Sequence, residues 1–191
     1  MAKSENNEVM FGARGRVGNL VVFKNYYGRT IISKVKTKRD KEEFNEKREL
    51  TKERFREAVI YAKGAIKDEI LCDFYRPFVK GGCKIYNLAM ADFCKLPQVK
   101  SVNVTSYHGN IGDHIIIRAF DNFKVVGVEV TVKKPNGCLL EGASAVLAAN
   151  EADWIYTATT FNAGVMGTII SVKVTDTPGN VAVFDQEIMM L

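Results

Sequence analysis

The sequence predicts an α+β N-terminal region, made of a β-hairpin and about three helices, followed by an all-β antiparallel sandwich. Between residue 40 and Pro97 the apolar residues recur at helical spacing, whereas after Pro97 they alternate with polar residues. The charge changes at the same point: residues 1–100 hold 22 Lys and Arg against 13 Asp and Glu, and residues 101–191 hold 5 against 9. We therefore predict a basic head, residues 1–97, and a β-sandwich domain, residues 98–191.

The head begins with a predicted β-hairpin, preceded by a polar and loosely ordered segment, residues 1–11. Runs of β-branched and aromatic residues, 20–23 and 30–35, flank a turn in which Gly28 adopts a positive φ. Apolar side chains point to both faces, and an isolated two-stranded hairpin is only marginally stable in water. Something must cover this hairpin, and the predicted interface consists of Leu20, Val21, Val22, Phe23, Ile31 and Ile32.

Three helices are predicted after the hairpin, over residues 40–64, from Ile66 to near Pro77, and over residues 83–95. Asp40 and Glu43 form a capping-box-like start for the first helix. The first half of that helix is almost entirely charged, and its apolar stripe widens only from Phe55 onward. We therefore expect only its C-terminal half to be anchored.

Seven short strands with turn signals between them predict the antiparallel sandwich. They fall near residues 99–106, 113–119, 125–133, 138–147, 153–160, 167–175 and 181–189. The last two strands form a closing hairpin around Asp-Thr-Pro-Gly-Asn, where Asp176 accepts a backbone hydrogen bond and Gly179 or Asn180 takes the positive φ. The alternation predicts one apolar face made of Ile170, Val172, Val174, Val181 and Val183.

Basic residues are concentrated near the hairpin, with nine between Arg14 and Lys41 against the single acid Asp40. Such a density can bind phosphate backbones, and the candidate residues are Arg14, Arg16, Lys34, Lys36, Lys38 and Arg39. Lysines on strand edges also protect a sheet against wrong pairing. We favour this second interpretation because no groove-binding motif accompanies the charge.

No catalytic motif is present, so we predict that the protein is not an enzyme and uses no cofactor. The four cysteines, Cys72, Cys83, Cys94 and Cys138, lack CxxC spacing and are expected to be reduced and buried. We predict no metal site. A zinc site with His108 or His114, or a calcium site built from Asp121, Asp153, Asp176 and Asp185, is the less favoured alternative to packing and turn-capping.

Four segments, GRVGNLVVFKNYYGRT, the charged helix, GGCKIYNLAMADF and the C-terminal strands, resemble an uncharacterised family of Bacteroidetes proteins. The runs GDHIIIRAFDNFKVVGVEVTV and TIISVKVTDTPGN are similar to strands of bacterial immunoglobulin-like modules. The resemblance implies an immunoglobulin-like sandwich behind a basic head, and no established activity.

The expected function is therefore that of a structural or interaction protein, which assembles through its hairpin with itself or within a larger assembly. A phage-like or contractile particle is one such assembly, by analogy with particles that carry immunoglobulin-like modules. Non-specific nucleic-acid binding through residues 14–56 is the alternative. No secretory signal or membrane span is visible, so we expect a cytoplasmic protein, or one released within a particle.

Overall fold

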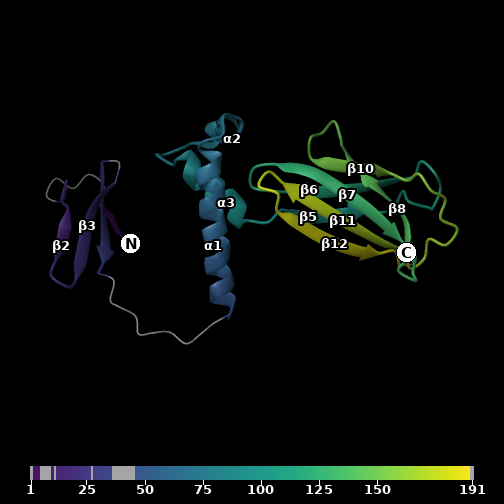
Figure 1. Cartoon of the computed structure of the whole chain (residues 1–191), viewed down its shortest axis with the longest axis horizontal. Coiled ribbons are helices and arrows are strands. Elements are labelled where there is room, and N and C mark those ends of the chain that lie inside the picture. The colour runs from purple at the N-terminus through teal and green to yellow at the C-terminus, as the bar shows by residue number, and fades with distance from the viewer. Residues whose placement is uncertain (1, 5–9, 11, 27, 36–45, 190–191) are drawn as a thin grey trace. The chain divides into compact units, whose positions relative to one another are not determined.

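The computed structural model describes residues 2–4, 10, 12–26, 28–35 and 46–189, and the chain divides into two compact units, Met1–Leu50 and Thr51–Leu191 (Figure 1). The architecture is α+β, with three α-helices and three antiparallel sheets in the described residues. None of the described helices is long and apolar enough to cross a membrane. The predicted domain boundary at residues 97 and 98 falls inside the second unit.

The first unit contains a four-stranded antiparallel sheet, here called the N-terminal sheet, in the order β1-β4-β3-β2. Its strands are β1 (Ala2–Ser4), β2 (Gly15–Val17), β3 (Val21–Tyr26) and β4 (Arg29–Lys34). The predicted hairpin is confirmed as β3 and β4, with Gly28 at φ +74°. The expectation that residues 1–11 are loose is wrong for β1, because this strand pairs with β4 and extends the sheet.

The helices follow the N-terminal sheet in the predicted order. They are α1 (Glu46–Ala65), α2 (Glu69–Tyr75), the 3-10 turn η1 (Arg76–Phe78) and α3 (Ile85–Cys94). The predicted start of the first helix at residues 40–45 lies outside the described residues. The second helix begins at Glu69 and not at Ile66, because Asp68 Oδ1 accepts hydrogen bonds from the backbone N–H groups of Ile70 and Leu71 and caps it.

These helices enclose a small core, here called the helical cluster, of Ala62, Ala65, Tyr75 and Ala89. The buried residues of α1 are Ala58, Ala62 and Ala65, which lie on one stripe of its C-terminal half. Within the described part of α1, the fully buried side chains thus lie in the C-terminal half, which was predicted to be the anchored one.

Residues 98–189, here called the β region, form two four-stranded sheets. One sheet has the order β5-β6-β10-β9, with β5 (Gln98–Asn103), β6 (His114–Phe120), β10 (Asp153–Thr157) and β9 (Val146–Leu147). The other has the order β12-β11-β7-β8, with β12 (Val181–Glu187), β11 (Ile169–Asp176), β7 (Val125–Lys133) and β8 (Leu139–Ser144).

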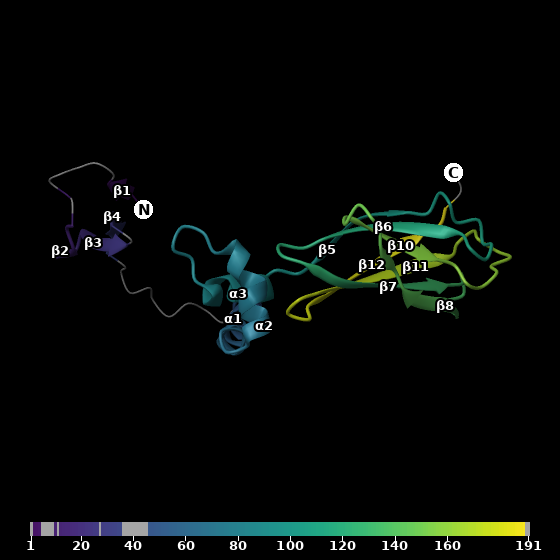
Figure 2. The ribbon, with the colours of Figure 1, turned by 90° about the horizontal axis from the view of Figure 1, so that it is seen from above.

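Figure 2 shows these two sheets facing each other across a common core. Ile115 and Ile117 of one sheet pack with Val130 and Val172 of the other, and all four side chains are 0% exposed. Tyr156 is buried and Trp154 packs against this core. The predicted single strand over residues 138–147 is wrong, because the chain changes sheets at the buried Ala145 and forms two strands, β8 and β9.

The closing hairpin of β11 and β12 corrects one further prediction. Gly179 takes the positive φ, +88°, and Val172 and Val174 are fully buried as expected. However, Val181 and Val183 are 42% and 62% exposed and do not continue the apolar face. The turn holds five residues between the paired Thr175 and Val181, so Ala182 and Phe184 oppose Val174 and Val172. A turn that is one residue longer or shorter places every side chain of the following strand on the opposite face.

The helical cluster joins the β region within the second unit. Phe123, in the loop between β6 and β7, packs edge-on against Tyr75 and Phe78, with ring centroids 5.4 and 5.0 Å apart. Asn180, in the closing turn, donates a hydrogen bond from Nδ2 to the carbonyl of Phe93 at the end of α3, over 3.2 Å. The candidate functional site lies at this joint.

Candidate functional site

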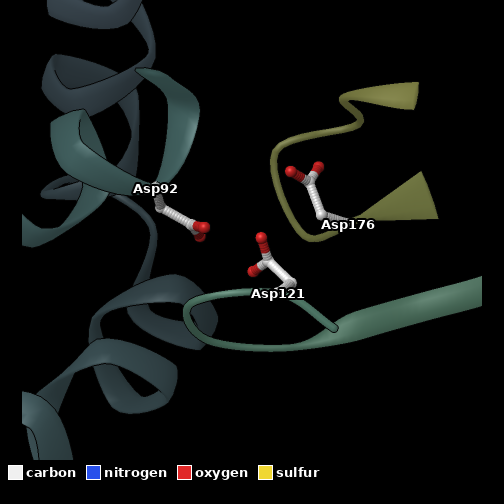
Figure 3. A group of neighbouring side chains, drawn as sticks. All are labelled: Asp92, Asp121 and Asp176. Carbon is white, nitrogen blue, oxygen red and sulfur yellow. The ribbon is translucent and has the colours of Figure 1, made fainter. Parts of the chain in front are cut away.

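Three buried aspartates, here called the aspartate cluster, meet at the joint between the helices and the β region (Figure 3). Asp92 lies near the end of α3, Asp121 follows β6, and Asp176 ends β11. They are 0%, 8% and 2% exposed, and one carboxylate oxygen from each lies within 4.8 Å of the other two. Residues far apart in the sequence thus place three acidic groups in one small volume.

Asp92 is the most buried member. Its Oδ2 accepts a 2.6 Å hydrogen bond from the hydroxyl of Tyr75, while its Oδ1 is buried and has no hydrogen-bond partner in the described part of the chain. Burial raises the pKa of Asp92 to about 6, with a smaller contribution from the negative charges of Asp121 and Asp176. Burial and the neighbouring carboxylate also raise the pKa of Tyr75, so its hydroxyl remains a donor.

Asp121 and Asp176 are held by their own turns. Asp121 Oδ2 accepts hydrogen bonds from the backbone N–H groups of Phe123 and Lys124, at 3.0 and 3.3 Å, and its Oδ1 is buried without a partner among the described residues. Asp176 Oδ1 accepts from the backbone N–H of Asn180 at 2.6 Å, and its Oδ2 from the Asn180 side chain at 2.8 Å. Burial raises the pKa of Asp176.

The charge of this cluster is uncompensated in the part of the chain that the structure describes. None of the described lysines and arginines forms an ion pair with the three carboxylates. Arg54 comes near the cluster only through Asn180, whose Oδ1 accepts from its Nη2 over 3.2 Å. Buried carboxylates normally have a positive partner, a proton or a metal ion, because an isolated buried charge is strongly unfavourable.

The sequence identified part of this cluster. Four aspartates were considered for the less favoured calcium site, and two of them, Asp121 and Asp176, come together and also cap turns. The other two do not join them: Asp153 binds Arg118 at 2.7 and 3.0 Å, and Asp185 is exposed on β12. Asp92 was missed. The available signal was its place as the one acidic residue in the apolar helix α3.

The histidines and cysteines do not form a site among the described residues. His114 Nδ1 lies 3.1 Å from the hydroxyl of Thr157. Neither histidine belongs to the group of described side chains that could hold a metal ion. All four cysteines are free, but the expectation that they are buried is wrong. Cys94, at the end of α3, and Cys138, next to a turn, are exposed, whereas Cys83, before α3, and Cys72, in the middle of α2, are half-buried.

The N-terminal sheet is the second candidate site, and its strand register separates its two faces. Side chains of paired residues share a face, so Val17 and Val21 lie with the neighbouring pair Phe23 and Ile32 on one side. This side is called the apolar face. The opposite face carries Arg16, Val22, Lys24, Ile31 and Arg29 and is called the basic face.

The predicted interface residues therefore do not form one surface. Val21, Phe23 and Ile32 lie on the apolar face, Val22 and Ile31 lie on the basic face, and Leu20 is in the turn between β2 and β3, 74% exposed. Of the predicted nucleic-acid-binding residues, Arg14, Arg16 and Lys34 are exposed. Lys36, Lys38 and Arg39 lie outside the described residues.

Comparison of the chain with protein-family models, with curated proteins and with solved structures finds no match.

Proposed function

We propose that this chain is a non-enzymatic structural protein that assembles through its N-terminal sheet and displays the β region. The observation that carries the proposal is the incomplete burial of that sheet. Among the described side chains of residues 10–35, Thr30 alone is buried, although β3 and β4 are rich in valine, isoleucine and phenylalanine.

Incomplete burial matters because apolar area contributes to stability only when it leaves water, at about 25 cal/mol per Å². Val17 is 55% exposed and Leu20 is 74% exposed, while Val21, Phe23 and Ile32 are half-buried. A contiguous apolar patch of this kind marks an interaction surface on a soluble protein. A partner that covers the apolar face would supply the burial that the sheet lacks.

A second copy of the same chain is the partner we favour. The described residues of the apolar face include no acidic side chain, and their one lysine is Lys34 at the end of β4, so two such faces can stack in the manner of packed sheets. The basic faces, with Arg16 and Lys24, would then point outward, because two of them placed against each other would repel. The interface would thus be isologous, with Phe23 near its centre.

The proposal extends to the β region, for which we favour an immunoglobulin-like sandwich displayed outward. Two antiparallel four-stranded sheets around one core support it, together with the change of sheet between β8 and β9. The resemblance to bacterial immunoglobulin-like strands and to the Bacteroidetes family adds to it, and a phage-like or contractile particle is a setting in which such display occurs.

Phe23→Asp tests the assembly in the full-length protein. A carboxylate at the centre of the apolar face should convert the oligomer into a monomer, measured by size-exclusion chromatography with light scattering. Val22→Asp is the matched control, since the neighbouring residue points to the basic face and should leave the oligomer largely intact. A wild-type protein that is monomeric at all concentrations would refute the proposal.

Binding of nucleic acid is the second candidate, and it is favoured by the charge of the basic face. The described residues 10–35 contain five basic residues and no aspartate or glutamate. If this face binds phosphate backbones, affinity for duplex DNA should fall steeply with salt, and charge reversal at Arg16 and Lys24 should flatten that dependence by about two in the log–log slope. Charge reversal at Lys173 of β11, in the β region, is the control. Binding that is absent, or independent of salt, would exclude this function.

A further inference from the structure

We propose that Asp92, Asp121 and Asp176 bind a calcium ion that links the helical cluster to the β region. The site rests on the aspartate cluster and is independent of how the N-terminal sheet assembles. It differs from the calcium alternative considered from sequence, because α3 contributes one of the three carboxylates and Asp153 and Asp185 take no part.

Two unpartnered oxygens are the observation that points to a ligand. Asp92 Oδ1 and Asp121 Oδ1 are both buried, and neither accepts a hydrogen bond from any described residue. Buried carboxylate oxygens in native proteins are almost always hydrogen-bonded or coordinated. The other oxygens are oriented by Tyr75 and by backbone N–H groups, which fixes the direction of the free ones. Such orienting hydrogen bonds are typical of the surroundings of metal ligands.

The spacing of the oxygens fits a calcium ion. Ca²⁺ binds oxygen at about 2.3–2.6 Å, so two ligands on opposite sides of one ion are about 5 Å apart. The three carboxylate oxygens lie within 4.8 Å of one another, inside that limit. Magnesium needs shorter bonds in a nearly regular octahedron, whereas calcium tolerates irregular sets of ligands from separate loops.

The loop that carries Asp121 also borders solvent. Asp121, Phe123 and Lys124 line a hollow of about 690 Å³ on the side of Phe120 and Trp154. Neither Asp92 nor Asp176 lines this hollow, so the aspartate cluster lies on the buried side of Asp121. A bound calcium ion would connect α3, the β6–β7 loop and the closing turn. Its positive charge would also offset the repulsion between the three carboxylates.

Calcium titration of the full-length protein, after removal of metal with EDTA, tests the inference. We expect CaCl₂ at about 100 times the dissociation constant to raise Tm by about 5 °C or more. The same concentration of MgCl₂ should produce a clearly smaller rise. Terbium, a luminescent substitute for calcium, should show emission excited through Tyr75, whose hydroxyl contacts Asp92. Added calcium should displace it.

Variants connect this response to the cluster. Asp92→Asn and Asp121→Asn should each abolish the calcium-dependent rise in Tm and the sensitised terbium emission. Asp185→Asn, which neutralises an exposed aspartate on β12, should retain both. No response in the wild type, a response kept in Asp92→Asn, or an equal response to magnesium would overturn the assignment. If Asp92→Asn fails to fold, Asp121→Asn and the wild-type titrations still decide it.

Discussion

The N-terminal sheet and the β region are both antiparallel, with alternating apolar residues, yet they differ in how far those residues are buried. Ile117 of β6 and Val172 of β11 are 0% exposed within a core shared by two sheets. Phe23 and Ile32 of the N-terminal sheet lie on a single sheet and remain half-buried. An apolar face contributes to folding only where a second layer covers it, so the same pattern builds a closed core in the β region and leaves a partly exposed face in the N-terminal sheet.

The largest expected difference is between Ile117→Ala and Ile32→Ala. Truncating Ile117 leaves a cavity in a closed core and should lower the free energy of unfolding of the β region by about 2–5 kcal/mol. Truncating Ile32 should leave that transition unchanged and weaken self-association instead. Urea denaturation followed by tryptophan fluorescence measures the first effect, since Trp154 packs against the core. Light scattering measures the second.

An equal loss of stability for the two variants would mean that Ile32 belongs to the folding core. The apolar face would then be covered from within the chain, and the proposed interface between copies would be wrong. The two substitutions remove the same atoms, so any difference between them reports the surroundings of the side chain.

Two turn glycines give a smaller, matched contrast. Gly28 and Gly179 have φ of +74° and +88°, and a Cβ added to either meets no atom within 4 Å. Gly179→Ala should therefore cost about 1–2 kcal/mol of backbone strain in the β region, seen as a lower urea midpoint. Gly28→Ala carries similar strain but should leave that midpoint unchanged. A shift of the same size in Gly28→Ala would show that the two units unfold together.

The sequence predicted the elements better than their registers. Both hairpins were found from alternation and turn residues, and Gly28 and Gly179 occupy the predicted positive-φ positions. The predicted orientation of Val181 and Val183 toward the core was wrong, because orientation in β12 depends on the number of residues in the preceding turn. Alternation within a strand shows which side chains share a face of that strand. It does not show which face of the next strand lies on the same side, because that depends on the number of residues in the turn.

The aspartate cluster was only partly predictable for a related reason. Asp121 and Asp176 follow strands in turn-like sequences, so their capping roles were visible locally. Asp92 joins them through the packing of α3 against the closing turn, where Asn180 bonds to Phe93. Nothing in the local sequence of α3 indicates that contact. The division of residues 138–147 between two sheets is likewise a property of the packed layers.

The smallest expected effect concerns charge on the outer surfaces of the two regions. In the β region, Lys173 Nζ lies 3.0 Å from Glu129 Oε2 of the neighbouring strand, with both side chains about half exposed. In the N-terminal sheet, Lys24 lies opposite Ile31, and the described residues 10–35 include no acidic side chain. Lys173→Ala should therefore cost at most about 0.2–1 kcal/mol of stability, and less at high salt.

Lys24→Ala should leave the tryptophan-monitored urea midpoint of the β region unchanged, and should slightly stabilise the N-terminal sheet by reducing repulsion with Arg16 on the same face. Because both effects are small, they should be measured at low and high ionic strength, where only the Lys173 effect should shrink. If Lys24→Ala proves as costly and as salt-sensitive as Lys173→Ala, the basic face has an acidic partner within the chain. Its charge would then be structural, and the nucleic-acid alternative would lose its main support.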